Sequence, residues 1–305
     1  MLIDFNTVKD KLNKIRTGEI KEGQKVGVPA IDDFIRFKKG NFNVILGHAN
    51  VGKTTVILYL MLVFAKRLNK RWLIFSSENE PHSILRKLVE FLEHKPITKI
   101  SEEVFNKHLD FINDYFKIID NGQLYTYRQI IELATAYKKA WDYQGLLIDP
   151  YNSLVKDNEL MKSLGGHEYD YQATTEIRVF SKKYGVTTWL NTHANTAALR
   201  QKHPMGHEYA GHPIPPMASD VEGGGKFVNR ADDFIVIHRY IQHPADWTQS
   251  HIHVRKIKEI ETGGKPTSID EPMRFKSMVG NVGFEIDGQP ILEKPIKEEF
   301  KPLIS

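Results

Sequence analysis

Residues 43–54 read NVILGHANVGKT, a short apolar run followed by a glycine-containing turn. From Gly47 to Thr54 the turn matches the pattern G-x-x-x-x-G-K-[ST] in full, and the helix-like run TTVILYLMLVFAKRL follows at once. Glycines in such a turn let successive backbone N–H groups face one phosphate, and the N-terminus of the next helix adds its dipole. The stretch therefore predicts the phosphate-binding loop of a nucleotide site. A plain strand–turn–helix without a ligand is the alternative.

The residues of this loop have separate predicted roles. Lys53 is expected to reach the β- and γ-phosphates of ATP, and Thr54 to bind Mg²⁺. The other residues of the loop and helix start that are predicted to contact the nucleotide are Gly47, Asn50, Val51, Gly52 and Thr55.

Two carboxylates are candidates for the acidic half of the site. Asp149 ends the apolar run GLLI, and an aspartate in this position can hold Mg²⁺ through water, although it could instead cap a helix. Glu78 follows the apolar run 72–75, and residues just past the ends of parallel strands gather at the edge that carries the phosphate loop. We predict that Glu78 orients and deprotonates the attacking water. Glu80 is its local competitor, and either glutamate could merely favour the dipole of the helix that starts at Pro81.

Short β-rich runs alternate with longer helix-like segments along most of the chain. This alternation predicts an α/β domain with a mostly parallel twisted sheet flanked by helices, followed after Ile252 by C-terminal β-hairpins with turns at Gly263-Gly264 and Asp287-Gly288. The expected parallel strands are Asn43–Leu46, Trp72–Phe75, Lys117–Ile119, Leu146–Ile148, Thr187–Asn191 and Phe234–His238.

Composition limits the class of protein. With 305 residues and 41% hydrophobic residues the chain can bury one substantial core, and the absence of cysteine excludes disulfides and cysteine-ligated metal sites. The start of the chain has no signal-like apolar run, and the longest apolar run, residues 56–65, is too short to cross a membrane. We therefore expect a cytoplasmic protein with no membrane partner. A net charge of +4 permits contact with nucleic acid without requiring it.

The first twenty residues are predicted to be a separate arm. Phe5, Val8, Leu12 and Ile15 have the spacing of one short amphipathic helix, and a polar stretch from Thr17 to Gln24 follows it. This helix could pack back on its own domain or dock on a neighbouring subunit. The expected organisation is an arm at residues 1–20 and one ATPase domain at residues 21–305.

Taken in order, these motifs resemble the superfamily-four helicases, which include the DnaB-type replicative helicases and, more closely in the second half, phage primase-helicases and mitochondrial Twinkle. The resemblance is carried by residues 27–32 and Gly40 before the phosphate loop, by FSSENEPHSILRKLVEF at residues 75–91, and by residues 146–149. It covers about residues 26–290. It implies a RecA-like P-loop NTPase core in which Glu78 is the catalytic glutamate.

The resemblance also assigns three later positions. His193, in TTWLNTHANT, falls where phage-type enzymes have a histidine that senses the γ-phosphate, whereas a histidine satisfied near a strand end is the alternative. Arg239 follows DVEGGG and ADD and would stack on the nucleotide base. Phe275, in MRF, would form the opposite face of that sandwich.

The sequence VRKIKEIETGG departs from the family pattern. The resembled proteins supply a lysine and an arginine finger, two residues apart, to the site of the neighbouring subunit. Here the pair is Lys256 and Lys258, with Arg255 just before them. Lysine can neutralise phosphate charge but lacks the planar fork of arginine, so the identity of the finger is open. An exposed basic strand is the alternative interpretation.

Residues 194–219, which we call the long loop, show no clear periodicity. A loop of this length is usually functional or disordered, and in the resembled enzymes the matching region lines a central channel and grips single-stranded DNA. Arg200, Lys202 and His203 are the predicted phosphate contacts. A zinc site at the clustered histidines competes, but HEYAGH has one residue too many for H-E-x-x-H.

The hypothesis that combines these observations is an ATP- and Mg²⁺-dependent helicase or translocase on single-stranded DNA in replication. The resemblance implies further copies of the chain in a hexameric ring as partners, with a primase or other replication proteins as additional candidates. Two alternatives remain open: a RecA/RadA-like recombination or repair ATPase, and a non-motor module whose assembly is controlled by nucleotide.

Overall fold

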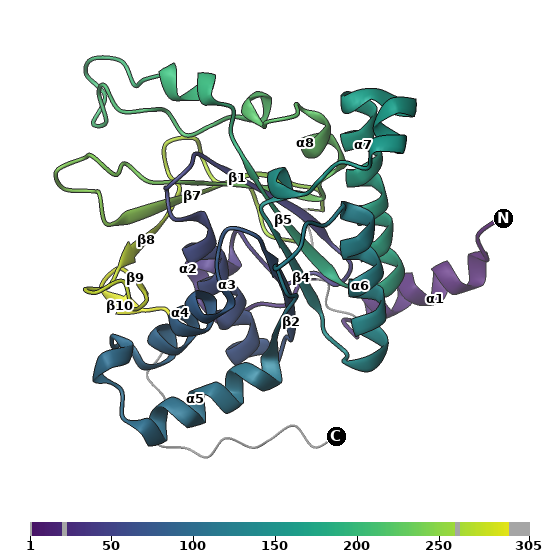
Figure 1. Ribbon diagram of the computed structural model, residues 1–305, viewed down its shortest axis with the longest axis horizontal. Helices are drawn as coiled ribbons and strands as arrows, with labels where there is room; N and C mark the ends of the chain where they lie inside the picture. Colours follow the sequence, from purple (N-terminus) through teal and green to yellow (C-terminus); the bar gives the residue numbers. More distant parts are fainter. Residues whose placement is uncertain (1, 20–22, 260–262, 293–305) are drawn as a thin grey trace.

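A computed structural model of the chain describes residues 2–19, 23–259 and 263–292. In this part of the chain a single twisted sheet has the strand order β10-β9-β8-β7-β6-β1-β5-β4-β2-β3, with helices on both faces (Figure 1). The predicted α/β class with a mostly parallel sheet is therefore confirmed.

The parallel part of the sheet runs from β6 to β3, and β1 lies between β5 and β6. The predicted runs match its strands to within two residues at each end. These strands are β1 (Phe42–Gly47), β2 (Trp72–Ser76), β3 (Phe116–Ile118), β4 (Gly145–Asp149), β5 (Thr187–His193) and β6 (Asp233–His238).

The remaining strands extend the sheet in antiparallel fashion beyond β6, as the turn signals in the last part of the sequence predict. They are β7 (Gln249–Ile257), β8 (Met273–Ser277), β9 (Phe284–Ile286) and β10 (Gln289–Pro290). The pairing of β6 with β7 is irregular near Phe234 and Ile235, where Arg255 has no partner in the ladder.

Two hydrophobic cores lie on opposite faces of the sheet because alternate residues of each strand point to opposite sides. One core packs Ile45, Trp72 and Trp189 against α3, α4 and α5. The other packs Phe42 and Val44 against α6, α7 and α8. The helices are α2 (Pro29–Asp32), α3 (Lys53–Leu68), α4 (Pro81–Glu93), α5 (Glu102–Tyr115), α6 (Tyr127–Ala140), α7 (Asn158–Tyr184) and α8 (Lys226–Arg230).

Helix α3 is buried on nearly all sides, with every residue from Val56 to Ala65 in the core. This explains why its sequence is apolar without the stripe of an amphipathic helix. None of the helices in the described ranges is long and apolar enough to cross a membrane.

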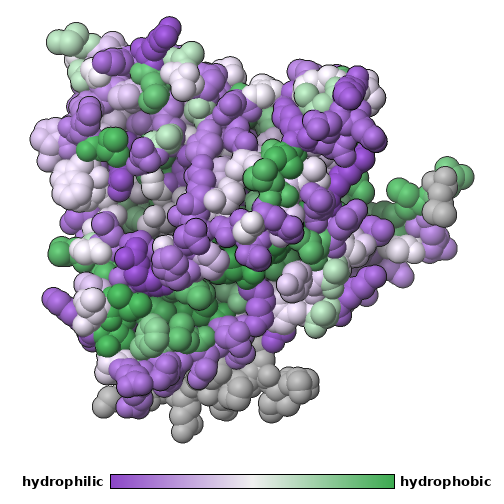
Figure 2. Space-filling view, in the orientation of Figure 1, coloured by the Kyte–Doolittle hydropathy of each residue, from purple (hydrophilic) through white to green (hydrophobic). Residues whose placement is uncertain are grey.

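The N-terminal arm forms the predicted helix, α1 (Phe5–Arg16). The Asp4 side chain caps it by accepting a hydrogen bond from the Asn6 backbone N–H at 3.1 Å. The helix projects from the domain and buries none of its residues (Figure 1). Hydrophobic atoms are exposed along it in Figure 2, and the side chain of Phe5 is 74% exposed and that of Leu12 58%. The alternative in which α1 packs on its own domain is therefore not seen. Residues 1 and 20 of the predicted arm lie outside the described residues.

The carboxyl ends of the parallel strands, which carry or shortly precede several of the predicted site residues, fall at one edge of the sheet. Gly47 ends β1, Ser76 ends β2, Asp149 ends β4, His193 ends β5 and His238 ends β6. Because these strands are parallel, their carboxyl ends share an edge, which is where α/β proteins hold ligands.

Candidate nucleotide site

The phosphate loop joins β1 to α3 through a backbone that requires small or permissive residues. At Gly47 an added Cβ atom would lie 2.4 Å from the carbonyl oxygen of Ile237 and 2.8 Å from Cδ of Lys53. Gly52 has a φ of 83° and Asn50 a φ of 60°, both in the left-handed region that glycine and asparagine tolerate best. The glycines of the motif are therefore explained by close packing at Gly47 and by backbone conformation at Gly52.

Lys53 is the first residue of α3 and is 5% exposed. Its Nζ donates to the backbone carbonyls of Gly47, at 3.0 Å, and His48, at 2.8 Å, so the loop itself holds the ammonium group. Burial lowers the pKa of Lys53 to about 8, although the carboxylates of Asp149 and Glu78 oppose this effect. If phosphate oxygens replaced these carbonyls as partners of Lys53 Nζ, they would place negative charge beside the ammonium group.

Asp149 lies at the centre of the site with no exposed surface. Its carboxylate accepts hydrogen bonds from the hydroxyls of Thr54, at 2.9 Å, and Ser76, at 3.4 Å, and from the Asn191 amide. Burial raises the pKa of Asp149, although the hydrogen bonds from Asn191 and Thr54 oppose this effect. Mg²⁺ prefers oxygen ligands, and the hydroxyl oxygens of Thr54 and Ser76 lie beside this buried carboxylate. Thr54 and Asp149 therefore fit the predicted metal role.

Glu78 and His193 face each other across the mouth of the site. Nε2 of His193 lies 3.3 Å from Oε1 of Glu78, and its Nδ1 lies 3.3 Å from Nζ of Lys53. The Glu78 side chain is 55% exposed, which leaves room for water beside it. Glu80 is instead the N-cap residue of α4 and makes no side-chain cap hydrogen bond there. The structure thus brings together Lys53, Thr54, Glu78, Asp149 and His193.

Several amide and hydroxyl side chains that the sequence interpretation missed support these groups. Asn121 donates to the backbone carbonyls of Ser76, at 2.9 Å, and Asn79, at 3.2 Å, and so holds the turn that carries Glu78. The Asn152 carbonyl oxygen accepts from the His193 N–H at 3.0 Å. Each of these asparagines follows a strand by only a few residues, which is the one sequence signal that could have pointed to them.

Arg239, which was predicted to stack on the nucleotide base, lies beside the phosphate loop. A Cβ atom added at Gly52 would be 3.9 Å from the guanidinium carbon and from Nη1 of Arg239. Phe275, which was predicted to stack on the other face of the base, does not fit that role. Phe275 lies on β8 with no exposed surface and packs within the core, where its ring centroid is 6.0 Å from that of Phe284. The sequence interpretation of Phe275 as a base-stacking residue is wrong because the aromatic ring faces the interior.

Arg255 and Lys256 lie on β7 and Lys258 follows it. All three contact groups outside the phosphate loop. Nζ of Lys256 donates to the carbonyls of Val228, at 2.8 Å, and Ala231, at 2.7 Å, at the end of α8. Lys258 is 47% exposed and lies 3.4 Å from Asp232. Arg255 is partly buried beside the long loop. Lys256 is thus engaged within its own chain, and Lys258 is the more exposed of the two lysines. Residues 260–262 of VRKIKEIETGG lie outside the described residues.

The predicted DNA contacts differ in accessibility. Arg200 and Lys202 are exposed on the long loop. His203, in the same loop, is partly buried, with Nε2 2.9 Å from the Tyr240 hydroxyl and its ring stacked on His207 at a centroid distance of 4.0 Å. Burial lowers the pKa of His203, which favours the neutral imidazole. His203 therefore fits a packing role better than the predicted contact with phosphate.

The clustered histidines of the long loop do not form a metal site. Within residues 2–19, 23–259 and 263–292, no group of three or more His, Asp or Glu side chains is placed to hold a metal ion. Stacking of His203 on His207 instead explains why these residues lie together.

Comparison with known proteins gives similarity at the level of structure. No protein-family model and no curated protein sequence matches the chain. The ATPase domain of a protein called G40P superposes with a TM-score of 0.73 and 13% identity, covering 93% of this chain and 99% of that one. The structure of a DnaB-like replicative helicase, described together with its interactions with primase, superposes with a TM-score of 0.70 and 14% identity. The match covers 93% of this chain and 67% of that one.

A KaiC-like protein from Pyrococcus horikoshii gives a TM-score of 0.56 and 16% identity, covering 87% of this chain and 98% of that one. Together these similarities show that the chain has the RecA-like fold of DnaB-like ATPase domains.

Proposed function

We propose that this protein is an ATP-hydrolysing DNA helicase or translocase that moves along single-stranded DNA in replication. The observation that carries the proposal is the position of His193. Its imidazole lies between Lys53 and Glu78, and its backbone leads directly into the long loop. A side chain that contacts both a phosphate-binding lysine and a catalytic carboxylate can report the loss of the γ-phosphate to the loop that follows it.

Each side chain of the site has a separate role in the proposed hydrolysis of ATP. Lys53 would hold the β- and γ-phosphates, and Thr54 and Asp149 are the residues that would hold Mg²⁺, Asp149 through water; the ion would neutralise phosphate charge. Glu78 orients water and accepts its proton as the water oxygen attacks the γ-phosphorus, and ADP departs as phosphate forms. The proton then passes to solvent from the exposed carboxylate.

The site is proposed to be completed by a second copy of the chain in a ring. The basic residues Arg255, Lys256 and Lys258 are the candidates for the neighbour's contribution, with Lys258 favoured by its exposure. Hydrolysis would change contacts between copies and move the long loops, whose exposed Arg200 and Lys202 suit a DNA backbone.

The apolar face of α1 is expected to hold neighbouring copies together. Burying Phe5 and Leu12 would each contribute about 1.5–3 kcal/mol, so the double variant Phe5→Ser/Leu12→Ser should weaken assembly at least ~10-fold. Sedimentation velocity with a nonhydrolysable ATP analogue would measure this. Asp10→Ser, on the opposite face of α1, is the matched control. Equal assembly of the double variant and the control would show that α1 does not dock on a neighbour.

The affinity for ATP is expected to fall as the pH rises above about 8, the pKa of Lys53. Only the ammonium form attracts the triphosphate, and bound phosphates would raise this pKa, so affinity should drop by up to ~10-fold per pH unit above it and stay level below it. Titration with a fluorescent nonhydrolysable analogue between pH 7 and 9.5 measures the effect. Lys53→Arg remains charged throughout and should lose the pH dependence. A constant dissociation constant in the parent protein would contradict the prediction.

The proposed function is tested by the rate of ATP hydrolysis with and without single-stranded DNA, followed by strand displacement on forked DNA. The proposal predicts strong stimulation by DNA and displacement of the duplex strand. Stimulation without displacement would favour a RecA/RadA-like recombination ATPase. ATP hydrolysis that DNA does not affect would favour a nucleotide-controlled assembly module.

A further inference from the structure

The long loop is attached to the rest of the molecule by aromatic and histidine side chains. Tyr209 stacks on Tyr240 with ring centroids 3.7 Å apart and an interplanar angle of 8°. The Tyr209 hydroxyl donates to Asp246 at 2.7 Å. We call this the loop–hairpin cluster. Its members are His203, His207, Tyr209 and His212 from the long loop, and Tyr240, His243 and His251 from β7 and the turn between β6 and β7.

The long loop is also a compact unit in itself. Its backbone bonds to itself where the His203 N–H donates to the His212 carbonyl at 3.0 Å and the Ile214 N–H donates to the Gln201 carbonyl at 2.9 Å. An isolated bridge joins Lys202 to Pro213. A loop closed on itself in this way moves as one body, so a side-chain attachment at one point can set the position of the whole loop.

The residues just before Tyr240 lie near the phosphate loop. Tyr240 follows His238 and Arg239 at the end of β6. The ring of His238 lies 5.9 Å from that of His48 in the phosphate loop, and the Arg239 guanidinium lies beside Gly52. Three consecutive residues therefore contact the phosphate loop on one side and the long loop on the other.

The chemistry of the cluster makes the contact firm at neutral pH. Tyr209 and Tyr240 are 3% and 4% exposed, so the stack is dry. Burial lowers the pKa of His251 to about 4, so its neutral ring packs against Tyr209 and Tyr240 without a buried charge. The two rings lie nearly parallel and bury each other's faces, and burial of aromatic surface stabilises the contact between Tyr209 and Tyr240.

We infer that the Tyr209–Tyr240 stack is a positioning contact that transmits the nucleotide state of the phosphate loop to the long loop, as a second connection beside His193. The inference rests on the proposed function for its role in DNA movement. Tyr209 touches neither nucleotide nor DNA in this scheme and acts only through Tyr240.

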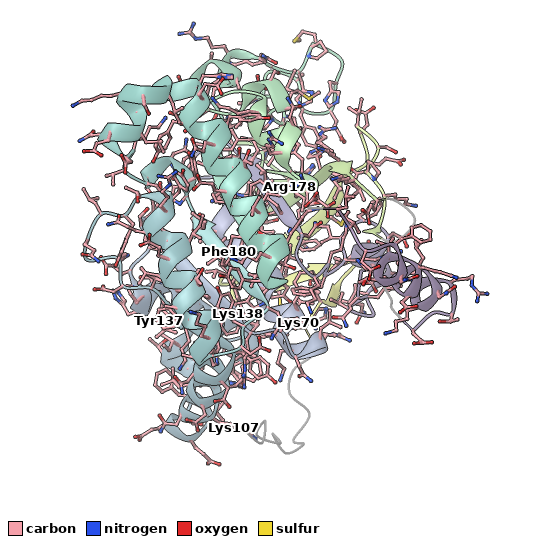
Figure 3. All side chains as sticks on the ribbon, turned by 90° about the vertical axis from the view of Figure 1, so that its right-hand side faces the viewer. Lys70, Lys107, Tyr137, Lys138, Arg178 and Phe180 are labelled. Carbon is pink, nitrogen blue, oxygen red and sulfur yellow. The ribbon has the colours of Figure 1, made fainter. Side chains whose placement is uncertain are left out.

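Tyr209→Ala tests the inference because it removes the stack from a surface loop without opening either core. The variant should keep the basal rate of ATP hydrolysis but lose stimulation by single-stranded DNA by about 10-fold, a typical size for coupling between sites. Tyr209→Phe keeps the ring and should retain most of the stimulation. The matched control is Tyr137→Ala, which removes a 40% exposed tyrosine of α6 on a different face (Figure 3).

A second measurement follows the long loop without DNA. Trypsin cleaves after Arg200 and Lys202, which are exposed in the loop. In the parent protein and in Tyr137→Ala, a nonhydrolysable ATP analogue should change the rate of this cleavage. In Tyr209→Ala the analogue should have no effect, whereas its binding to the protein should be unchanged.

The outcomes separate the two proposals. A Tyr209→Ala variant with a parent-like response of cleavage to nucleotide would overturn the positioning role, whatever DNA does. A parent protein that DNA does not stimulate would end the proposed function, while the cleavage experiment would still decide whether the stack connects the two loops.

Discussion

Replacing Lys53 by alanine is expected to reduce kcat/KM for ATP hydrolysis by at least ~1000-fold. The ammonium group is buried among backbone carbonyls and lies 3.3 Å from Nδ1 of His193. In such a water-poor site a fixed positive charge stabilises developing phosphate charge far more than it does in water, and loss of one such group typically costs ~10²–10³ in rate. Loss of ATP binding adds to this reduction in kcat/KM.

The control for this variant is Lys66→Ala, at the exposed end of the same helix. It should hydrolyse ATP at the parent rate. Circular dichroism and thermal unfolding of both variants would show whether α3 remains folded. Hydrolysis by Lys53→Ala at the parent rate, with the control also active, would show that ATP is not hydrolysed at this loop.

Glu78→Gln is expected to separate binding from hydrolysis. The change keeps the size of the side chain, which lies 3.3 Å from His193 as Glu78, but removes the proposed base for the proton of water. General base catalysis contributes about 10²–10⁴-fold, so kcat should fall by that factor while the dissociation constant of a nonhydrolysable analogue changes little. Rates of phosphate release and equilibrium titration would measure the two quantities.

Glu80→Gln is a matched control for this prediction, since the two glutamates are two residues apart and both are exposed. Only Glu78 contacts His193, so Glu80→Gln should retain the parent kcat. The reverse result, with Glu80→Gln inactive and Glu78→Gln active, would move the base to the other glutamate.

The parts of the site nearest the backbone could be predicted from the sequence. The glycine pattern specifies a backbone path, and the carboxyl ends of parallel strands meet at one edge, so Lys53, Thr54 and Asp149 follow from local sequence and topology alone. Glu78 was predicted from the same topology, with Glu80 as its competitor, whereas the role of His193 came from the resemblance.

The contacts that the sequence did not predict depend on which way side chains face in the tertiary structure. Phe275 is aromatic and close to the expected position, but β8 presents it to the core instead of to a nucleotide. Lys256 was expected to serve another subunit, but two carbonyls at the end of α8 hold it. His203 was predicted to contact DNA phosphate, but it is partly buried in the loop–hairpin cluster, beside the Tyr240 hydroxyl.

The place of β1 in the sheet has a mechanical consequence. This strand is aligned with β5 from Phe42 to Gly47 and with β6 from Asn43 to Leu46, on either side. Tension applied along β1 would load these ladders in shear, so many bonds would resist together instead of opening one by one. The strand that carries the phosphate loop is therefore braced on both sides against strain that arrives through the ends of β5 and β6.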